Sequence, residues 1–284
     1  MSLKNKTNEI LNMYNIRAKK KYGQNFLVDE KILDSIVTGA GISNNDIVIE
    51  IGPGLGNLTE KLLEKAKLVI AFEIDEDMCN ILKDRFEGNC KFVLLNQDVL
   101  KANIDDILNK YNKEYSQVKL VANLPYYITT PIMFKIFEST SFISSMTIMV
   151  QKEVADRIVA TPKGKDYGVL TVTTKFYGEA VKLLDVPNSS FIPAPNVTSS
   201  VVNINVVQKY DVKNREVFFK LVKAAFSQRR KKIINSLENS KAFDVSKEKL
   251  QSIIKDNNVN ENARAEEIDI QTYVDIANEL QDML

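Results

Sequence analysis

Residues 46–56, DIVIEIGPGLG, constrain the fold of this chain more than any other stretch. Apolar residues dominate its first half, which predicts a strand buried on both faces. The strand runs into three alternate glycines, Gly52, Gly54 and Gly56, and a helical pattern follows as far as Lys65. Glycine lets a ligand approach the backbone closely, so the segment predicts a nucleotide-binding corner between a strand and a helix.

The glycine spacing indicates which kind of nucleotide this corner would bind. A dinucleotide fingerprint reads G-x-G-x-x-G, whereas this chain has G-x-G-x-G with Pro53 inside it. The third glycine comes one residue earlier than in the dinucleotide fingerprint. This spacing suits a cofactor whose ribose and carboxylate contact the turn and which has no pyrophosphate at the helix N-terminus. The spacing therefore favours S-adenosyl-L-methionine over NAD. Taken alone, the segment also fits a strand-helix turn without any ligand.

Strand and helix patterns alternate after this corner, which predicts an α/β fold with a parallel sheet covered by helices on both faces. From residue 213 onward the pattern is helical only, so a domain boundary is expected near Tyr210. The expected domains are therefore 1–210, with a basic N-terminal arm at 1–23, and 211–284. The further strands are predicted at 67–75, 91–95, 117–122, 146–150, 181–186 and 199–207.

Three polar residues follow successive predicted strands, at the edge where open α/β sheets bind their ligands. Glu73 could hold ribose hydroxyls with its two acceptor oxygens, and Asp98 could accept from an adenine amino group. Asn123 ends the next strand. Each residue alone fits an ordinary loop or cap. Together, beside a glycine corner, they favour a ligand site.

The most specific motif is Asn123-Leu124-Pro125-Tyr126. The exocyclic amine of a base is a poor nucleophile, because its lone pair is delocalised into the ring. The Asn123 amide oxygen and the Leu124 carbonyl could accept its two N–H bonds, while Pro125 fixes the turn and Tyr126 stacks on the base. Phe191, in a stiff proline-rich loop, could form a second aromatic wall. A strand-ending turn with core aromatics is the alternative for both segments.

The distribution of charge points to a polyanion, although the net charge of +1 does not. Residues 1–23 carry six Lys or Arg against one acidic residue, and residues 211–242 carry nine against three. Two basic segments on a nearly neutral chain indicate a localised polyanion-binding face, while a charge run also fits a solvated surface. The phosphate-contact candidates are Lys19, Lys20, Lys21, Lys163, Lys165, Arg229, Arg230, Lys231 and Lys232.

The composition excludes several classes of chemistry. The chain has no histidine, which rules out imidazole acid-base catalysis, His-dependent triads and His-ligated metals. Its two cysteines, Cys79 and Cys90, match no zinc spacing and suit reduced thiols in a cytoplasmic protein. No apolar run reaches the ~20 residues of a membrane span, and the N-terminus lacks the apolar region of a secretory signal. Neither a metal nor a membrane is therefore expected.

With these residues assembled, the chain resembles the ribosomal RNA small-subunit adenine N6-dimethyltransferase family. The resemblance covers roughly residues 19–240 in order, which single glycine motifs would not do. One departure is Lys232, where the family often has threonine. The matching stretches are QNFL at 24–27, EIGPGLGNLT at 50–59, FEID at 72–75, QDVL at 97–100, NLPYYI at 123–128, FIPAPNVTSSVV at 191–202 and AFSQRRKKIINSL at 225–237.

The resemblance implies a Rossmann-like methyltransferase fold, with a seven-stranded, mostly parallel sheet and a small C-terminal α-helical domain that binds RNA. It implies dimethylation of two adjacent adenosines in the 3′-terminal hairpin loop of 16S rRNA, within an immature small ribosomal subunit. An adenine would stack between Tyr126 and Phe191, and a monomer is expected. The residues implied to bind or border S-adenosyl-L-methionine are Asn25, Leu27, Gly52, Glu73, Asp98 and Asn123.

Three other functions compete with this interpretation. The sister methyltransferase that modifies one large-subunit rRNA adenine, and confers macrolide resistance, shares the aromatic motif. The segment at 225–237 and the long C-terminal domain favour the small-subunit enzyme. The intact Asn-Leu-Pro-Tyr motif argues against a non-catalytic assembly factor. The glycine spacing and the absence of histidine argue against an NAD oxidoreductase.

Overall fold

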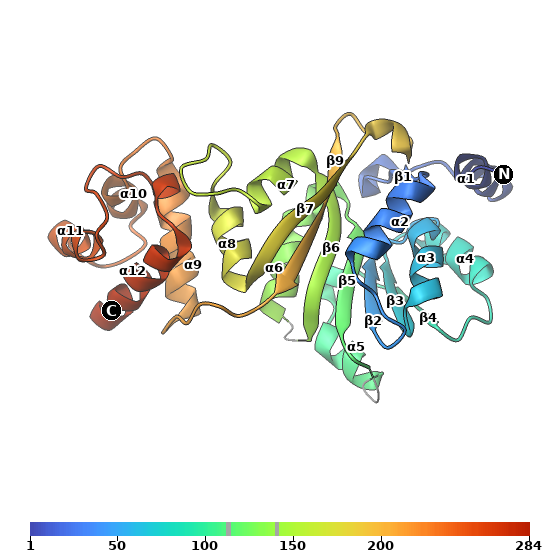
Figure 1. Cartoon of the computed structure of the whole chain (residues 1–284), viewed down its shortest axis with the longest axis horizontal. Helices are drawn as coiled ribbons and strands as arrows, with labels where there is room; N and C mark the ends of the chain where they lie inside the picture. The colour runs from blue at the N-terminus through green and yellow to red at the C-terminus, as the bar shows by residue number, and fades with distance from the viewer. Residues whose placement is uncertain (112–114, 140–141) are drawn as a thin grey trace. The chain divides into compact units, whose positions relative to one another are not determined.

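The computed structural model describes residues 1–111, 115–139 and 142–284, and it forms two compact units (Figure 1). The first unit contains Met1–Ala155 and Val181–Val206. The second contains Asp156–Ala180 and Val207–Leu284. The chain thus crosses between the units three times, whereas the boundary predicted near Tyr210 leaves residues 156–180 with the sheet.

The described residues of the first unit are built around a seven-stranded sheet of order β4-β3-β2-β5-β6-β9-β7. The buried strand predicted after Asp46 is β2, and all five of its residues are buried. Neighbours from β4 to β6 pair in parallel, and β9 pairs antiparallel with β6. The strands are β2 (Ile47–Ile51), β3 (Leu68–Glu73), β4 (Phe92–Asn96), β5 (Val118–Asn123), β6 (Ile143–Gln151), β7 (Gly178–Val186) and β9 (Ser199–Val206). The predicted Rossmann-like fold, with a mostly parallel sheet, is confirmed.

One face of this sheet is covered by α2 (Glu30–Gly39) and α3 (Asn57–Lys65), which lie side by side in Figure 1. Ile36 of α2 and Leu62 of α3 join Val48 and Val69 of the strands in one apolar core. α2 begins where the Asp29 carboxylate accepts hydrogen bonds from two backbone N–H groups of its first turn. The other helices of this unit are α1 (Leu3–Met13), α4 (Glu76–Arg85), α5 (Ile104–Lys110), α6 (Thr129–Ser139) and the start of α7 (Lys152–Ile158).

The N-terminal residues form a helix, α1, despite the weak helical periodicity of residues 1–18. Ile10 and Leu11 pack against the cluster of Phe26, Leu55, Met78 and Ile81, so tertiary contact stabilises the helix. The hydroxyl of the buried Thr7 accepts a hydrogen bond of 3.1 Å from the Asn57 side chain. Packing and this polar contact fix the arm against the rest of the first unit.

The second unit is helical, as predicted for the C-terminal region, and has its own apolar core. Sequence periodicity does not predict its first helix, because the segment that forms it is rich in β-branched residues. Val172 and Phe176 nevertheless lie one turn apart in this core, and the Phe176 ring stacks on Phe218 with centroids 4.7 Å apart. The helices are α8 (Val169–Tyr177), α9 (Arg215–Ala225), α10 (Ile233–Ser240), α11 (Lys247–Asp256) and α12 (Ile270–Met283).

Candidate active site

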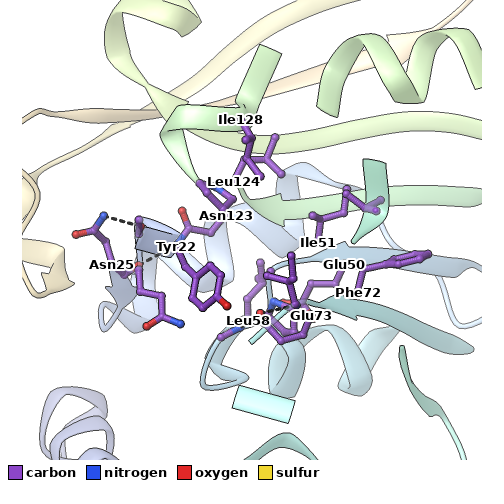
Figure 2. Close-up of a pocket in the computed structure, with 18 of the residues that line it drawn as sticks. Tyr22, Asn25, Glu50, Ile51, Leu58, Phe72, Glu73, Asn123, Leu124 and Ile128 are labelled. Atoms are coloured by element: carbon purple, nitrogen blue, oxygen red, sulfur yellow. Dashed lines mark hydrogen bonds between the residues drawn. The ribbon is translucent and has the colours of Figure 1, made fainter. Parts of the chain in front are cut away.

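A cavity of about 250 Å³ lies at the carboxyl ends of the strands in the first unit (Figure 2). Its walls include the ends of β2, β3 and β5, together with residues 22–27 at the end of the N-terminal arm and directly after it. β2 pairs with β3 on one side and with β5 on the other, so the chain changes direction across the sheet at this point. Such a switch point is where open α/β sheets bind ligands. The sequence prediction of a site at successive strand ends agrees with this position.

The three glycines of the corner all adopt positive φ angles, from +56° to +84°, which only glycine adopts without strain. Gly52 and Gly54 line the cavity. Gly56 is not among the lining residues: a Cβ there would lie 2.8 Å from the Phe86 ring and 2.9 Å from Leu82. Gly56 therefore permits close packing of the α3 start against α4, and its predicted contact with a cofactor does not fit its position.

Glu73, at the end of β3, contacts the glycine corner directly. Its Oε2 accepts a hydrogen bond of 3.1 Å from the Gly54 N–H, and its Oε1 accepts from Ile74 and Asp75 at 2.8 and 2.9 Å. The residue is only 6% exposed, and burial raises the pKa of its carboxyl despite these three donors. The carboxyl group is thus fixed at the cavity wall, where it can accept hydrogen bonds from the hydroxyls of a ribose.

Glu50 is a cavity residue that the sequence reasoning missed. It is 1% exposed on β2, and its Oε2 accepts a hydrogen bond of 2.7 Å from the Thr59 hydroxyl. Burial, together with the charge of Glu73, raises the pKa of Glu50 to about 8. An acidic residue inside an otherwise apolar buried strand was the signal available in the sequence.

Asn123 faces the cavity from the end of β5. Its side-chain nitrogen donates a hydrogen bond of 3.2 Å to the backbone carbonyl of Asn25, and Figure 2 shows the two residues together. This bond fixes the amide with its nitrogen toward the arm, so Oδ1 is left as the acceptor for a ligand. The buried Leu124 is held by its backbone N–H, which donates to the Met149 carbonyl at 3.2 Å.

Tyr126 and Tyr127 follow in a short 3₁₀ turn, Tyr126–Ile128, and both line the cavity. The half-buried Tyr126 hydroxyl lies 2.5 Å from the hydroxyl of the buried Ser199, and burial raises its pKa. The turn is tied at Pro125, whose carbonyl accepts from the Ile128 N–H at 3.1 Å. Hydrogen bonds therefore hold the Asn-Leu-Pro-Tyr segment in a fixed turn beside the glycine corner.

Phe191 does not lie at the cavity. It is 3% exposed in the short strand β8 (Phe191–Ile192), where it pairs with Leu27 of β1 (Phe26–Leu27) and joins the apolar core. The aromatic wall predicted at this residue does not fit that position, because the fold uses the ring for packing. Leu27, Asn25 and Asp98 do line the cavity. Asp98 also accepts a hydrogen bond of 3.0 Å from the Leu100 N–H, so one of its oxygens is already used.

The N-terminal lysines have different surroundings. Lys19 forms ion pairs of 2.6 and 2.5 Å with Asp75 and Asp77, and these carboxylates raise its pKa. Lys19 is therefore an anchor of the arm, contrary to its predicted contact with RNA phosphate. Lys21 is exposed. The side chain of Lys20 lies outside the described residues.

The remaining basic candidates all belong to the second unit. The Arg229 guanidinium donates hydrogen bonds to the carbonyls of Lys165 and Tyr167, at 2.7 and 3.1 Å. These bonds attach the loop at 161–167 to the segment that begins α10. Arg229 thus has a structural role in addition to its charge. The exposed basic side chains of this basic cluster are Lys163, Lys165, Arg229, Arg230, Lys231 and Lys232.

The charges of the cavity discriminate between cofactors. Of the described residues that line it, Glu50, Glu73 and Asp98 carry carboxyl groups, and none is lysine or arginine. Acidic groups without any cationic side chain disfavour a pyrophosphate and suit a sulfonium, while Ile51 and Ile74 supply apolar contacts. These residues fit S-adenosyl-L-methionine and argue against NAD.

The described residues include no group of three or more Cys, Asp or Glu side chains placed to hold a metal ion. Within the same residues, no helix has the length and apolar character needed to cross a membrane.

Comparison with known proteins places the chain in a family. The family model described as "Ribosomal RNA adenine dimethylase" matches residues 15–282. The ribosomal RNA small subunit methyltransferase A of Clostridioides difficile (strain 630) is 42% identical over 280 residues, which cover 98% of this chain and 96% of that one. The protein of the same name from Bacillus licheniformis is 40% identical over 282 residues, covering 98% and 97%.

Two solved structures extend the likeness to the fold. A dimethyladenosine transferase from Plasmodium falciparum matches with a TM-score of 0.76 and 28% identity, covering 90% of this chain and 98% of that chain. The 23S rRNA methyltransferase ErmE matches with a TM-score of 0.67 at 24% identity, covering 90% and 100%, which shows a shared fold alone. With the family match over nearly the whole sequence, these findings show that the chain belongs to the ribosomal RNA adenine dimethylase family.

Proposed function

We propose that this enzyme transfers methyl groups from S-adenosyl-L-methionine to N6 of two adjacent adenosines in the 3′-terminal hairpin loop of 16S rRNA. The observation that carries the proposal is that the Asn123–Tyr126 turn and the Gly54–Glu73 corner border one cavity. A site for a methyl donor and a site for a purine amine therefore lie next to each other. Relatives named for the small subunit are about 40% identical along the whole chain, which favours that substrate over the large-subunit alternative.

The residues of the cavity bind and orient the reactants. Glu73 and the glycine corner would hold the cofactor, which supplies an electrophilic methyl group when bound. Asn123 Oδ1 and the Leu124 carbonyl would accept the two N–H bonds of the adenine amine and direct its lone pair into the cavity. Tyr126 would stack on the flipped base. Positioning and the exclusion of water account for the acceleration. The newly methylated amine is cationic and acidic, so it releases its proton to water after the transfer and needs no side chain as a dedicated base.

The partner is rRNA, and we propose that the enzyme acts as a monomer on immature small subunits in the cytoplasm. The basic cluster of the second unit would bind phosphates that lie outside the cavity. Its lysines and arginines are exposed, and two stretches distant in sequence contribute to it. The second unit would thus supply affinity, while the first supplies the chemistry.

Reversing two charges of this cluster should weaken RNA binding. We expect the double substitution Lys231→Glu and Lys232→Glu to lower the affinity for small subunits and to reduce the slope of log K against log salt by roughly two. Filter binding over a series of salt concentrations measures both quantities. Lys19→Gln is the matched control, because Lys19 is paired with Asp75 and Asp77 and its loss should leave the salt slope unchanged. An unaltered slope in the double variant would remove these lysines from the interface.

The proposed function is tested by supplying labelled methyl donor with either immature small subunits or large-subunit RNA. We expect label in 16S rRNA, recovered as N6,N6-dimethyladenosine at two adjacent positions. Label confined to 23S rRNA would identify the enzyme as the large-subunit type. Binding of small subunits without any transfer would identify it as an assembly factor.

A further inference from the structure

We propose that Tyr127, packed against Gly23, is a second stacking platform at the cavity for the nucleobase adjacent to the target adenosine. The inference deepens the proposed function and rests on it, because it takes an unpaired RNA strand with two neighbouring adenosines as the ligand. Neither the sequence motif nor the purine site at Asn123 requires this residue to be aromatic.

Tyr127 combines exposure with a place in the wall of the cavity. The residue is 58% exposed, which makes it the most exposed aromatic residue of the described part of the chain. It nevertheless lines the same cavity as Asn123 and Glu73. An aromatic ring that remains in water beside a binding cavity offers a π-face to any base, whatever its identity.

The backbone of the arm packs against the Tyr127 ring. Gly23 has φ +60°, and a Cβ at this position would lie 3.3 Å from Cδ1 of the Tyr127 ring and 3.9 Å from Cβ of Pro125. The glycine therefore lets the arm pass against the ring without displacing it. A ring held in this way loses little conformational entropy when a base stacks on it.

Tyr126 and Tyr127 are consecutive, but they have opposite environments. The Tyr126 hydroxyl is held 2.5 Å from the hydroxyl of the buried Ser199, whereas Tyr127 packs one side on Gly23 and is otherwise largely exposed. Two consecutive aromatic residues, one facing the interior and one at the surface, can each stack on one of two consecutive bases. While one adenine occupies the cavity, its neighbour would stack on Tyr127. The second adenosine would thus remain bound while the first is methylated.

Lys21 supplies a cation two residues before Gly23, the residue that packs against the Tyr127 ring. Its Nζ lies 4.5 Å from the centroid of the Tyr22 ring, and Tyr22 is part of the cavity wall. Lys21 is exposed, whereas Lys19 is paired with two carboxylates. An aromatic face beside a lysine is the combination that binds single-stranded RNA by stacking and by phosphate contact.

Replacing the aromatic face tests the platform. We expect Tyr127→Leu to lower kcat/KM for immature small subunits about tenfold or more, while the free energy of unfolding in urea stays near the wild-type value and reports an intact fold. Tyr127→Phe keeps the π-face and should retain the wild-type kcat/KM. If Tyr127→Leu has the wild-type kcat/KM, or if Tyr127→Phe loses as much as Tyr127→Leu, the platform is refuted.

A crosslink locates the contact independently of turnover. With p-azidophenylalanine at position 127, irradiation of the complex with unmodified small subunits should stop primer extension at a nucleotide next to a target adenosine. The same probe at Tyr111, which is exposed after α5 and outside the cavity, should give no stop in that loop. Stops elsewhere in the RNA, or none, would overturn the proposal even if the wild-type enzyme methylates 16S rRNA. Absence of methylation by the wild type would instead count against the proposed function.

Discussion

Replacement of Asn123 by alanine should reduce methyl transfer about 100-fold or more. The amide nitrogen of Asn123 is tied to the Asn25 carbonyl, so its oxygen is the fixed acceptor that aligns the adenine amine. Without it, the amine is no longer held in the orientation for attack, and its lone pair remains conjugated with the ring. The measurement is the rate of labelled methyl incorporation into immature small subunits at saturating cofactor.

Two comparisons separate this role from a loss of structure. The affinity of Asn123→Ala for S-adenosylhomocysteine, measured by calorimetry, should change much less than the rate. Asn103→Ala removes a different asparagine, the N-cap of α5, and should cost about 1 kcal/mol of stability without a loss of turnover. Full activity in Asn123→Ala would refute the assignment of the amide as the acceptor of the amine.

Glu50→Gln should stabilise the protein increasingly as pH rises from about 5 to 8. The folded protein holds the pKa of Glu50 at about 8, against its ordinary value of 4.5. Between these two values the folded state retains a proton that the unfolded state has lost, so wild-type stability falls as pH rises. Glutamine can keep the bond to the Thr59 hydroxyl and cannot ionise. The gain should therefore reach ~4 kcal/mol near pH 8 and change little above it.

Urea unfolding at pH 5, 6.5 and 8 measures this difference. An exposed glutamate provides the control: Glu87→Gln should leave the pH dependence unchanged, because its charge is in water before and after unfolding. A free energy difference between Glu50→Gln and the wild type that does not vary with pH would show that Glu50 is ionised in the folded protein.

Local sequence determined the sheet, the glycine corner and the strand-end residues. Alternating strand and helix patterns predict the order of elements from β2 to β6 because hydrophobic periodicity and glycine turns act over a few residues. Glu73, Asp98 and Asn123 could be predicted as neighbours for the same reason, since parallel strands bring their carboxyl ends to one edge.

Only the tertiary structure decided how several residues are used, because burial and charge pairing depend on segments distant in the chain. Phe191 is core because it pairs with Leu27, and Lys19 is an anchor because it meets Asp75 and Asp77. α8 is a helix because its apolar side chains reach the C-terminal core, which outweighs the preference of its β-branched residues for strands. Hydrophobic periodicity shows which side chains of one segment can be buried. Which other segment covers those side chains, and which charged residue a lysine pairs with, depends on contacts between residues distant in the sequence, and a local pattern does not contain them.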